Sequence, residues 1–288
     1  VERLQLNEET IWSGSPNNNA HDKALPALPK VRELIFAGKY KEAQDLATRD
    51  IMSQTNNGMN YQTFGSVYLS FPGHQNYTDY YRDLNIENAT AKVQYTVNGV
   101  TFTREVISAF SDQVIAVKLS ASEPGQITCN VFMNSPFDKT VTSTESEQIA
   151  LSGVSSSYEG QKGRVKFQGR VFAKNEGGNK SVSNGIISIE NANEVTLYIS
   201  IATNFKDYKT LTKDQEEKSK AYLDKAITKD FETIKKSHVA YYQKFFNRVS
   251  LDLGVTEAVN ETTEKRIRKF DSQFDPQLAA LYFQFGRY

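Results

Sequence analysis

The longest amphipathic pattern of the chain lies in residues 214–249, where apolar residues recur three, four or seven positions apart. This spacing places them in one stripe along a helix, with lysines and glutamates on the opposite face. The stripe comprises Leu223, Ile227, Phe231, Ile234, Tyr241 and Phe245. The pattern predicts one long helix that connects two bodies, which are the strand-rich region before it and the segment after Leu253.

Two further elements are predicted after this helix. Residues 249–253 form a short apolar strand, and residues 277–288 form a second helix with Asp275 as its N-cap and Pro276 at its first position. The second helix is apolar on nearly every side, and such a helix is normally buried inside a larger helical body. We therefore expect the native protein to continue well beyond Tyr288.

The first 58 residues predict a strand, a loop and a helical pair. Residues 1–6 alternate as an opening strand, and residues 7–19 have the Asn, Ser, Gly and Pro content of a loop. Two short amphipathic helices follow at residues 28–36 and 40–51, separated by Gly38. The polar run Asn56, Asn57 and Gly58 ends this pair.

From Phe64 onward the hydrophobic period changes to two, which predicts strands. The clearest unit is a hairpin over residues 91–106 that turns at Asn98 and Gly99. Further strands are predicted at residues 67–71, 114–119, 127–133, 165–173, 186–189 and 195–201. The Ser- and Gly-rich residues 140–163 are expected to form a surface loop. About ten strands without helices between them predict an antiparallel sandwich or barrel, in a mainly β fold.

Charge and composition narrow the possible partners. Lys plus Arg and Asp plus Glu number 34 each, so no net field attracts nucleic acid or an anionic membrane, and a neutral substrate such as a sugar fits best. No apolar run reaches the roughly 18 residues of a membrane-spanning helix. The three histidines have no spacing typical of metal ligands, so neither a metal nor another cofactor is expected.

The single cysteine, Cys129, alternates with Ile127, Val131 and Met133 on one face of a predicted strand. This position predicts a buried, inert thiol rather than a nucleophile. Arg104 shares a strand face with Phe102 and Val106, which predicts a partly buried, paired arginine that joins two sheets.

Several segments, taken in order, resemble the N-terminal part of glycoside hydrolase family 95, the inverting α-L-fucosidases. They are LQLNEETIWSG (residues 4–14), YQTFG (61–65), YRDL (81–84), FTREV (102–106), DQVI (112–115), RVSLDLG (248–254), and DP with YFQFGRY (275–288). The resemblance implies a large antiparallel β super-sandwich in residues 1–213, a helical linker with one short strand in 214–263, and the start of an (α/α)6 catalytic barrel in 264–288.

The resemblance also implies where the chemistry lies. The family's acid, base and water-orienting residues belong to the barrel, after Tyr288, so no catalytic residue is assigned to this chain. The implied partners are a fucosylated glycan and the chain's own C-terminal barrel, without nucleic acid or membrane, and a periplasmic or secreted location is favoured.

Three loop residues are the candidates for substrate contact: Asn7, Glu8 and Trp12. Trp12 can stack on a sugar face, although it can equally fill the edge of the sandwich or its interface with the barrel. Glu8 and Glu9 cannot act together as acid and base, because adjacent residues in an extended chain point to opposite sides. Asn7 or one of these glutamates is expected to hydrogen-bond to backbone or sugar.

Three functions stay open at this point. The leading hypothesis is the non-catalytic N-terminal region of a fucosidase, inactive as an isolated fragment. The alternative is a free-standing carbohydrate-binding sandwich in which exposed aromatic residues bind the glycan. A third possibility keeps the architecture but changes the reaction, because phosphorylases also combine a sandwich with a helical barrel.

Overall fold

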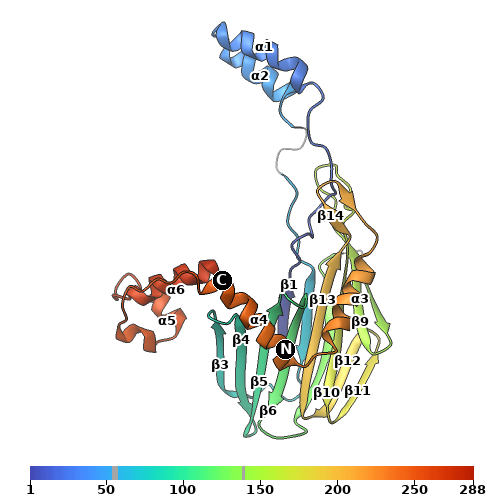
Figure 1. The fold of residues 1–288 in the computed structure, drawn as a ribbon, viewed down its shortest axis with the longest axis vertical. Helices are drawn as coiled ribbons and strands as arrows, with labels where there is room; N and C mark the ends of the chain where they lie inside the picture. Colours follow the sequence, from blue (N-terminus) through green and yellow to red (C-terminus); the bar gives the residue numbers. More distant parts are fainter. Residues whose placement is uncertain (54–57, 138–139) are drawn as a thin grey trace.

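The computed structural model describes residues 1–53, 58–137 and 140–288, and its centre is a sandwich of two antiparallel sheets (Figure 1). The five-stranded sheet has the order β1 (Glu2–Leu6), β2 (Gly65–Ser70), β7 (Ile127–Asn134), β12 (Ile186–Ala192) and β11 (Asn179–Ser183). The eight-stranded sheet has the order β3 (Thr78–Asn85), β4 (Thr90–Val97), β5 (Val100–Ala109), β6 (Val114–Ala121), β13 (Glu194–Thr203), β10 (Lys166–Glu176), β9 (Gln148–Val154) and β8 (Val141–Glu145). The mainly β, antiparallel prediction is confirmed.

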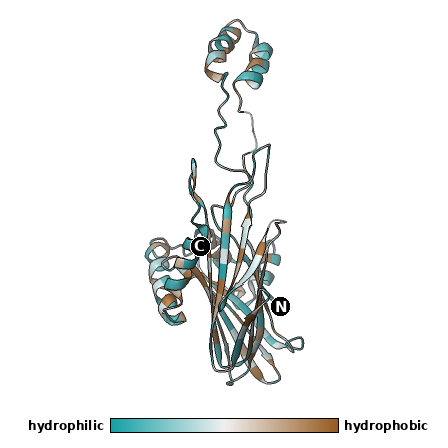
Figure 2. Cartoon of the chain, turned by 90° about the vertical axis from the view of Figure 1, so that its right-hand side faces the viewer, coloured by the Kyte–Doolittle hydropathy of each residue, from teal (hydrophilic) through white to brown (hydrophobic). Residues whose placement is uncertain are grey.

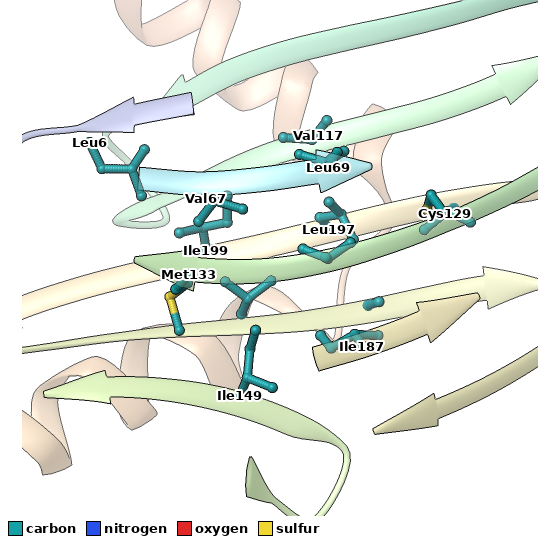
Figure 3. Close-up of a cluster of buried hydrophobic side chains, with 14 of the residues drawn as sticks. Leu6, Val67, Leu69, Val117, Cys129, Met133, Ile149, Ile187, Leu197 and Ile199 are labelled. Atoms are coloured by element: carbon teal, nitrogen blue, oxygen red, sulfur yellow. The ribbon is translucent and has the colours of Figure 1, made fainter. Parts of the chain in front are cut away.

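The main core fills the space between the two sheets, where each strand contributes its alternate side chains. Figure 3 shows Val67, Leu69 and Met133 of the five-stranded sheet facing Val117, Leu197 and Ile199 of the other. Cys129 belongs to this core with no exposed surface, and burial raises the pKa of its thiol to about 12. The thiol is therefore inert at neutral pH, as its strand position predicts.

Arg104 of β5 joins the two sheets, as predicted. Its guanidinium pairs with Glu2 of β1 and donates to the Tyr95 hydroxyl at 2.6 Å. It also lies over the ring of Phe71, 4.1 Å from the ring centre. These contacts keep a nearly buried charge paired between the two sheets.

The turn and strand predictions are mostly correct. Asn98 and Gly99 have φ values of 50° and 83°, the conformation that tight hairpins require, and they join β4 to β5. The expected surface loop at residues 140–163 is wrong, because β8 and β9 form a hairpin there and bury Ile149 and Leu151. Gly153 is needed within β9, because a Cβ atom there would lie 2.3 Å from the Phe167 ring.

The predicted single helix over residues 214–249 is wrong, because two helices occupy this region: α3 (Gln215–Ala226) and α4 (Phe231–Phe246). Asp230 interrupts the helix in an extended conformation, and its carboxylate accepts a hydrogen bond from Thr233 N at 2.7 Å. The Tyr198 hydroxyl donates to Lys229 O at 2.7 Å and fixes the break against the sheet. The N-cap at Asp230 thus stabilises two separate helices over one continuous helix.

Both helices cover the outer face of the eight-stranded sheet, where a second core includes Ile107, Tyr198, Leu223, Phe231 and Ile234. The break changes which face of α4 is buried. His238 and Phe246 are buried, whereas Tyr241 and Phe245 of the predicted stripe are exposed.

The segment after α4 differs from the prediction in one place. Residues 249–253 form no strand and are exposed, since no neighbouring strand pairs with them. A short 3₁₀ helix (Glu257–Asn260) and α5 (Thr263–Arg268) follow. The last helix, α6 (Pro276–Arg287), is as predicted: Asp275 accepts from Leu278 N at 3.0 Å, and Pro276 occupies the first turn.

A helical pair, here called the arm, consists of α1 (Ala24–Phe36) and α2 (Tyr40–Asp50) and confirms the predicted pair. The arm has its own small core, built around Val31, Leu34 and Ala43. Both views place it well clear of the sandwich (Figures 1 and 2). The chain reaches the arm through residues 12–23 and returns through residues 58–63, which are here called the legs. The predicted end of this pair at Asn56 and Asn57 lies outside the described residues. A small ribbon of β14 (Phe205–Asp207) and β15 (Thr210–Leu211) completes the fold.

Candidate functional site

The predicted substrate-binding loop begins where β1 ends. Leu6 is buried and its carbonyl accepts hydrogen bonds from Phe64 N at 3.0 Å and Thr63 Oγ1 at 2.7 Å. Ile11 is fully buried and fixes the loop to the core again five residues later. Asn7, between these two anchors, is exposed at the surface.

Glu8 is half-buried and braces the loop from within. Its carboxylate accepts hydrogen bonds from Thr10 N at 2.8 Å and Thr10 Oγ1 at 2.7 Å, and the Thr10 hydroxyl also contacts Thr203 of β13. Burial raises the pKa of Glu8, although the Thr10 hydrogen bonds and the positive charge of Lys218 act in the opposite direction. Glu8 therefore links the loop to the eight-stranded sheet.

Trp12 forms an exposed aromatic pair with Tyr61 at the base of the legs. The two ring centres lie 5.1 Å apart with an interplanar angle of 61°, and 44% of Trp12 and 45% of Tyr61 is exposed. The indole N–H donates to Glu9 O at 2.8 Å, and the Tyr61 hydroxyl donates to Glu8 O at 3.3 Å. Both rings are thus held by backbone carbonyls while their faces meet solvent, an arrangement that suits sugar stacking.

The backbone beneath this pair is fixed by hydrogen bonds between the two legs. Gln62 N donates to Ile11 O at 2.9 Å and Ser13 N donates to Asn60 O at 2.9 Å, so the legs leave the sandwich as a short antiparallel ribbon. Gly14 N then donates to Ser156 O at 2.7 Å. Gly14 has a φ of 69°, a backbone conformation that favours glycine. A Cβ atom there would also lie 2.6 Å from Met59 Sδ, so position 14 requires glycine.

The two adjacent glutamates do not form an acid–base pair. The Glu8 carboxylate points inward to Thr10, whereas Glu9 is exposed and accepts the Trp12 indole through its carbonyl. The Glu8 carboxylate is thus occupied by the two Thr10 hydrogen bonds. Breaking a glycosidic bond by inversion needs two carboxyl groups on opposite sides of one sugar.

A cleft lies between strands β3–β5 and helices α5 and α6. This cleft has a volume of about 1430 Å³, and its walls include Leu84, Val106, Phe270, Leu281 and Phe285. Most lining residues are apolar, although Arg82, Asp83 and Lys92 also line the cleft. A sugar would lose hydrogen bonds to water against the apolar part of this lining. The cleft is better suited to apolar protein side chains than to a glycan.

One buried ion pair lies beside this cleft. Arg266 contacts Asp275 through two hydrogen bonds of 2.8 and 2.9 Å, and this ion pair lowers the pKa of Asp275. Within residues 1–53, 58–137 and 140–288, no group of three or more His, Cys, Asp or Glu side chains is arranged to hold a metal ion. No helix in the same residues is long and apolar enough to cross a membrane.

The structure places Asn7, Glu8 and Trp12 in one loop, where they differ in exposure and in hydrogen bonding. Trp12 is exposed and Glu8 is half-buried, and Tyr61 joins them although sequence reasoning did not single it out. The signal for Tyr61 was its place in the YQTFG motif, next to a polar stretch. Only the pairing of the two legs brings it to Trp12.

Two family models match this chain. One is described as "Glycosyl hydrolase family 65, N-terminal domain" and matches residues 1–208. The other is described as "Glycosyl hydrolase family 95 catalytic domain" and matches residues 230–288. The first match covers the sandwich, and the second covers α4, α5 and α6.

Two relatives align with the entire chain. Alpha-L-fucosidase 2 of Arabidopsis thaliana is 32% identical over 320 residues, and Probable alpha-fucosidase A of Aspergillus niger is 22% identical over 308 residues. The chain spans 37% and 38% of the lengths of these two proteins. Among solved structures, a putative kojibiose phosphorylase from the human microbiome is 9% identical with a TM-score of 0.46, covering 65% of this chain and 29% of that chain.

Proposed function

Because the chain belongs to the glycoside hydrolases that join a family 65-type N-terminal domain to a family 95 catalytic domain, we propose that it is the N-terminal region of an α-L-fucosidase. The full-length protein would hydrolyse terminal α-L-fucosides. The observation that carries this proposal is the 32% identity, across the whole chain, to a protein named Alpha-L-fucosidase 2.

The chain would divide into three parts with different tasks. Residues 1–213 form the bracing sandwich, residues 214–263 form the linker, and residues 264–288 begin the catalytic barrel. The exposed apolar side chains of α6 support the last assignment: Tyr282 is 78% exposed and Phe285 is 53% exposed. A helix with such a surface is expected to pack against further helices.

The loop of residues 7–19 would reach the rim of the glycan pocket. Trp12 and Tyr61 would stack on a sugar ring, and the exposed amide of Asn7 would hydrogen-bond to a hydroxyl group. Glu8 would act indirectly, because its carboxylate holds the turn through Thr10. The 44% exposure of Trp12 supports this role over core packing.

The decisive experiment compares the full-length protein with the 288-residue chain on a fucosylated oligosaccharide. We expect release of free fucose by the full-length protein, at a rate independent of added phosphate, and no release by the 288-residue chain. Phosphate-dependent formation of a sugar phosphate would instead assign a phosphorylase. Turnover by the 288-residue chain would place the catalytic carboxylates within it.

The exposed Trp12–Tyr61 pair also favours a second candidate, a carbohydrate-binding sandwich without catalysis. This function predicts measurable binding of a fucosylated oligosaccharide to the 288-residue chain by calorimetry, lost in Trp12→Ala. Absence of heat with the glycan would reject it and leave the bracing role.

A further inference from the structure

The arm is poorly supported by the rest of the described structure. Its helices have 13 and 11 residues, lengths at which an isolated helix is marginal in water. Its core consists of Val31, Leu34 and Ala43, with a few partly buried neighbours that all come from the arm and its C-terminal end. Such a small core, held away from the sandwich, would gain stability from a further packing partner.

The charges of the arm do not supply that support. The ion pairs Lys30–Glu33 and Lys41–Asp45 lie at the surface, with all four side chains more than half exposed. Exposed pairs of this kind contribute little to stability. They also leave little net charge, so the partner of the arm need not be charged.

The arm instead exposes an apolar end. Phe36 is 87% exposed and Tyr40 is 70% exposed, on either side of the turn between α1 and α2. This turn is well defined, because Gly38 has a φ of 74° and Lys39 N donates to Leu34 O at 2.9 Å. The backbone that carries the two aromatic rings is therefore well defined, while the rings themselves face solvent. Exposed apolar side chains of this kind mark a docking surface.

We propose that this apolar end of the arm docks on the family 95 catalytic domain of the same polypeptide. The inference rests on the proposed function, in which residues 230–288 begin a larger catalytic domain. The chain spans 37% of the length of its Arabidopsis relative, so most of such a protein remains to provide the partner surface.

The small size of the surface favours this partner over a second copy of the chain. Stable interfaces between separate proteins use about 20–30 residues on each side, more than one end of two short helices offers. Within one polypeptide the effective concentration is high, so a few apolar side chains are sufficient. The legs that carry the arm also carry Trp12 and Tyr61, so docking would fix this pair at the glycan pocket.

Cross-linking of the full-length protein tests the proposal, because Lys39 and Lys41 flank Tyr40. An equal mixture of unlabelled and ¹⁵N-labelled protein is unfolded, refolded together, treated with an amine-reactive cross-linker and analysed by mass spectrometry. We expect links from these lysines to lysines beyond Tyr288, within single copies. Phe36→Asp should lower their yield by at least about fivefold, whereas the exposed Glu33→Gln should not.

Three results would overturn the proposal. Links between labelled and unlabelled copies would assign a second copy as the partner, and links confined to the arm and legs would show that the arm docks nowhere. An undiminished yield in Phe36→Asp would remove the apolar end from the contact. Amide hydrogen exchange of α1 and α2 that is slower than in an unfolded chain would show that the arm of this variant is still folded. Docking without fucose release would refute the proposed function alone.

Discussion

Trp12 shows how hydrogen bonding decides the placement of an aromatic residue. Its indole N–H is satisfied by Glu9 O at 2.8 Å, so the ring needs no partner in the core and lies against Tyr61 at the surface. Neither ring contributes to the main core between the sheets. Substitution of either residue should therefore affect ligand contact more than folding.

Trp12→Ala and Tyr61→Ala are each expected to raise KM for a fucosylated oligosaccharide about five- to tenfold in the full-length protein, with kcat nearly unchanged. Steady-state kinetics give the two constants, and thermal unfolding should give the wild-type Tm. Tyr208→Ala is a matched control, because Tyr208 is 73% exposed and lies outside this loop. An unchanged KM in both variants would restrict the pair to a structural role.

The buried carboxylate of Glu8 should make stability depend on pH. Burial raises its pKa above the ordinary value of 4.5, and a carboxyl group with a raised pKa destabilises the fold at pH values above its folded pKa. This cost disappears as the pH falls below the unfolded pKa. Glu8→Gln keeps an oxygen acceptor for Thr10 and should raise Tm by a few degrees at pH 7, with no gain below about pH 4.

Thermal unfolding of the 288-residue chain at both pH values checks this prediction, with the exposed Glu9→Gln as control. A gain of equal size at both pH values would show that ionisation of Glu8 is not its cause.

The break between α3 and α4 is decided by one cap and one buried contact. Continuation of the helix past Ile227 would satisfy the local hydrophobic period, but the Asp230 cap and the Tyr198 hydrogen bond to Lys229 O favour two helices. The break allows both helices to follow the twisted outer face of the eight-stranded sheet. As a result, His238 and Phe246 lie on the buried side of α4, and Tyr241 and Phe245, which the single-helix prediction placed there, are exposed.

Ile234→Ala should lower the free energy of unfolding of the 288-residue chain by about 2–4 kcal/mol, because Ile234 is fully buried beneath α4. Phe245→Ala, in the same helix, should cost less than about 1 kcal/mol, because Phe245 is 47% exposed. Urea unfolding followed by circular dichroism measures both values. Equal losses would mean that the buried face of α4 is assigned incorrectly.

At the scale of the whole molecule, the sandwich has its own core and the C-terminal helices contact it sparsely. The cleft of about 1430 Å³ separates α5 and α6 from β3–β5. The C-terminal end of α6 contacts the end of α4 and the segment after it. Arg287 donates to Phe246 O and Val249 O, both at 2.7 Å, and the ring centres of Tyr288 and Tyr242 lie 6.1 Å apart. This arrangement fits a catalytic domain whose beginning is held beside the sandwich.

Deletion of residues 249–288 is therefore expected to leave the sandwich folded, with Tm changed by no more than about 3 °C. Thermal unfolding followed by near-ultraviolet circular dichroism, which reports the packing of the aromatic core, tests this expectation. Loss of a cooperative transition would show that α5 and α6 are integral to the sandwich.

The local alternation of apolar and polar residues was sufficient to predict the strands that bury one face. Ile127, Cys129, Val131 and Met133 alternate and are buried as predicted. It was insufficient for β3, whose residues are nearly all exposed at the edge of its sheet. It was also insufficient for β8 and β9, which lie within the Ser- and Gly-rich residues 140–163. Edge strands and close sheet contacts do not produce the alternation that a sequence displays.

The sequence by itself determined the strand-rich class of the protein, its Asn98–Gly99 hairpin and the N-cap of its last helix, because each follows from side-chain period or local backbone preference. Tertiary structure decided the partner of Arg104, the break at Asp230 and the meeting of Trp12 with Tyr61. These features depend on groups far apart in the chain, and only the packed sheets bring such groups within contact distance.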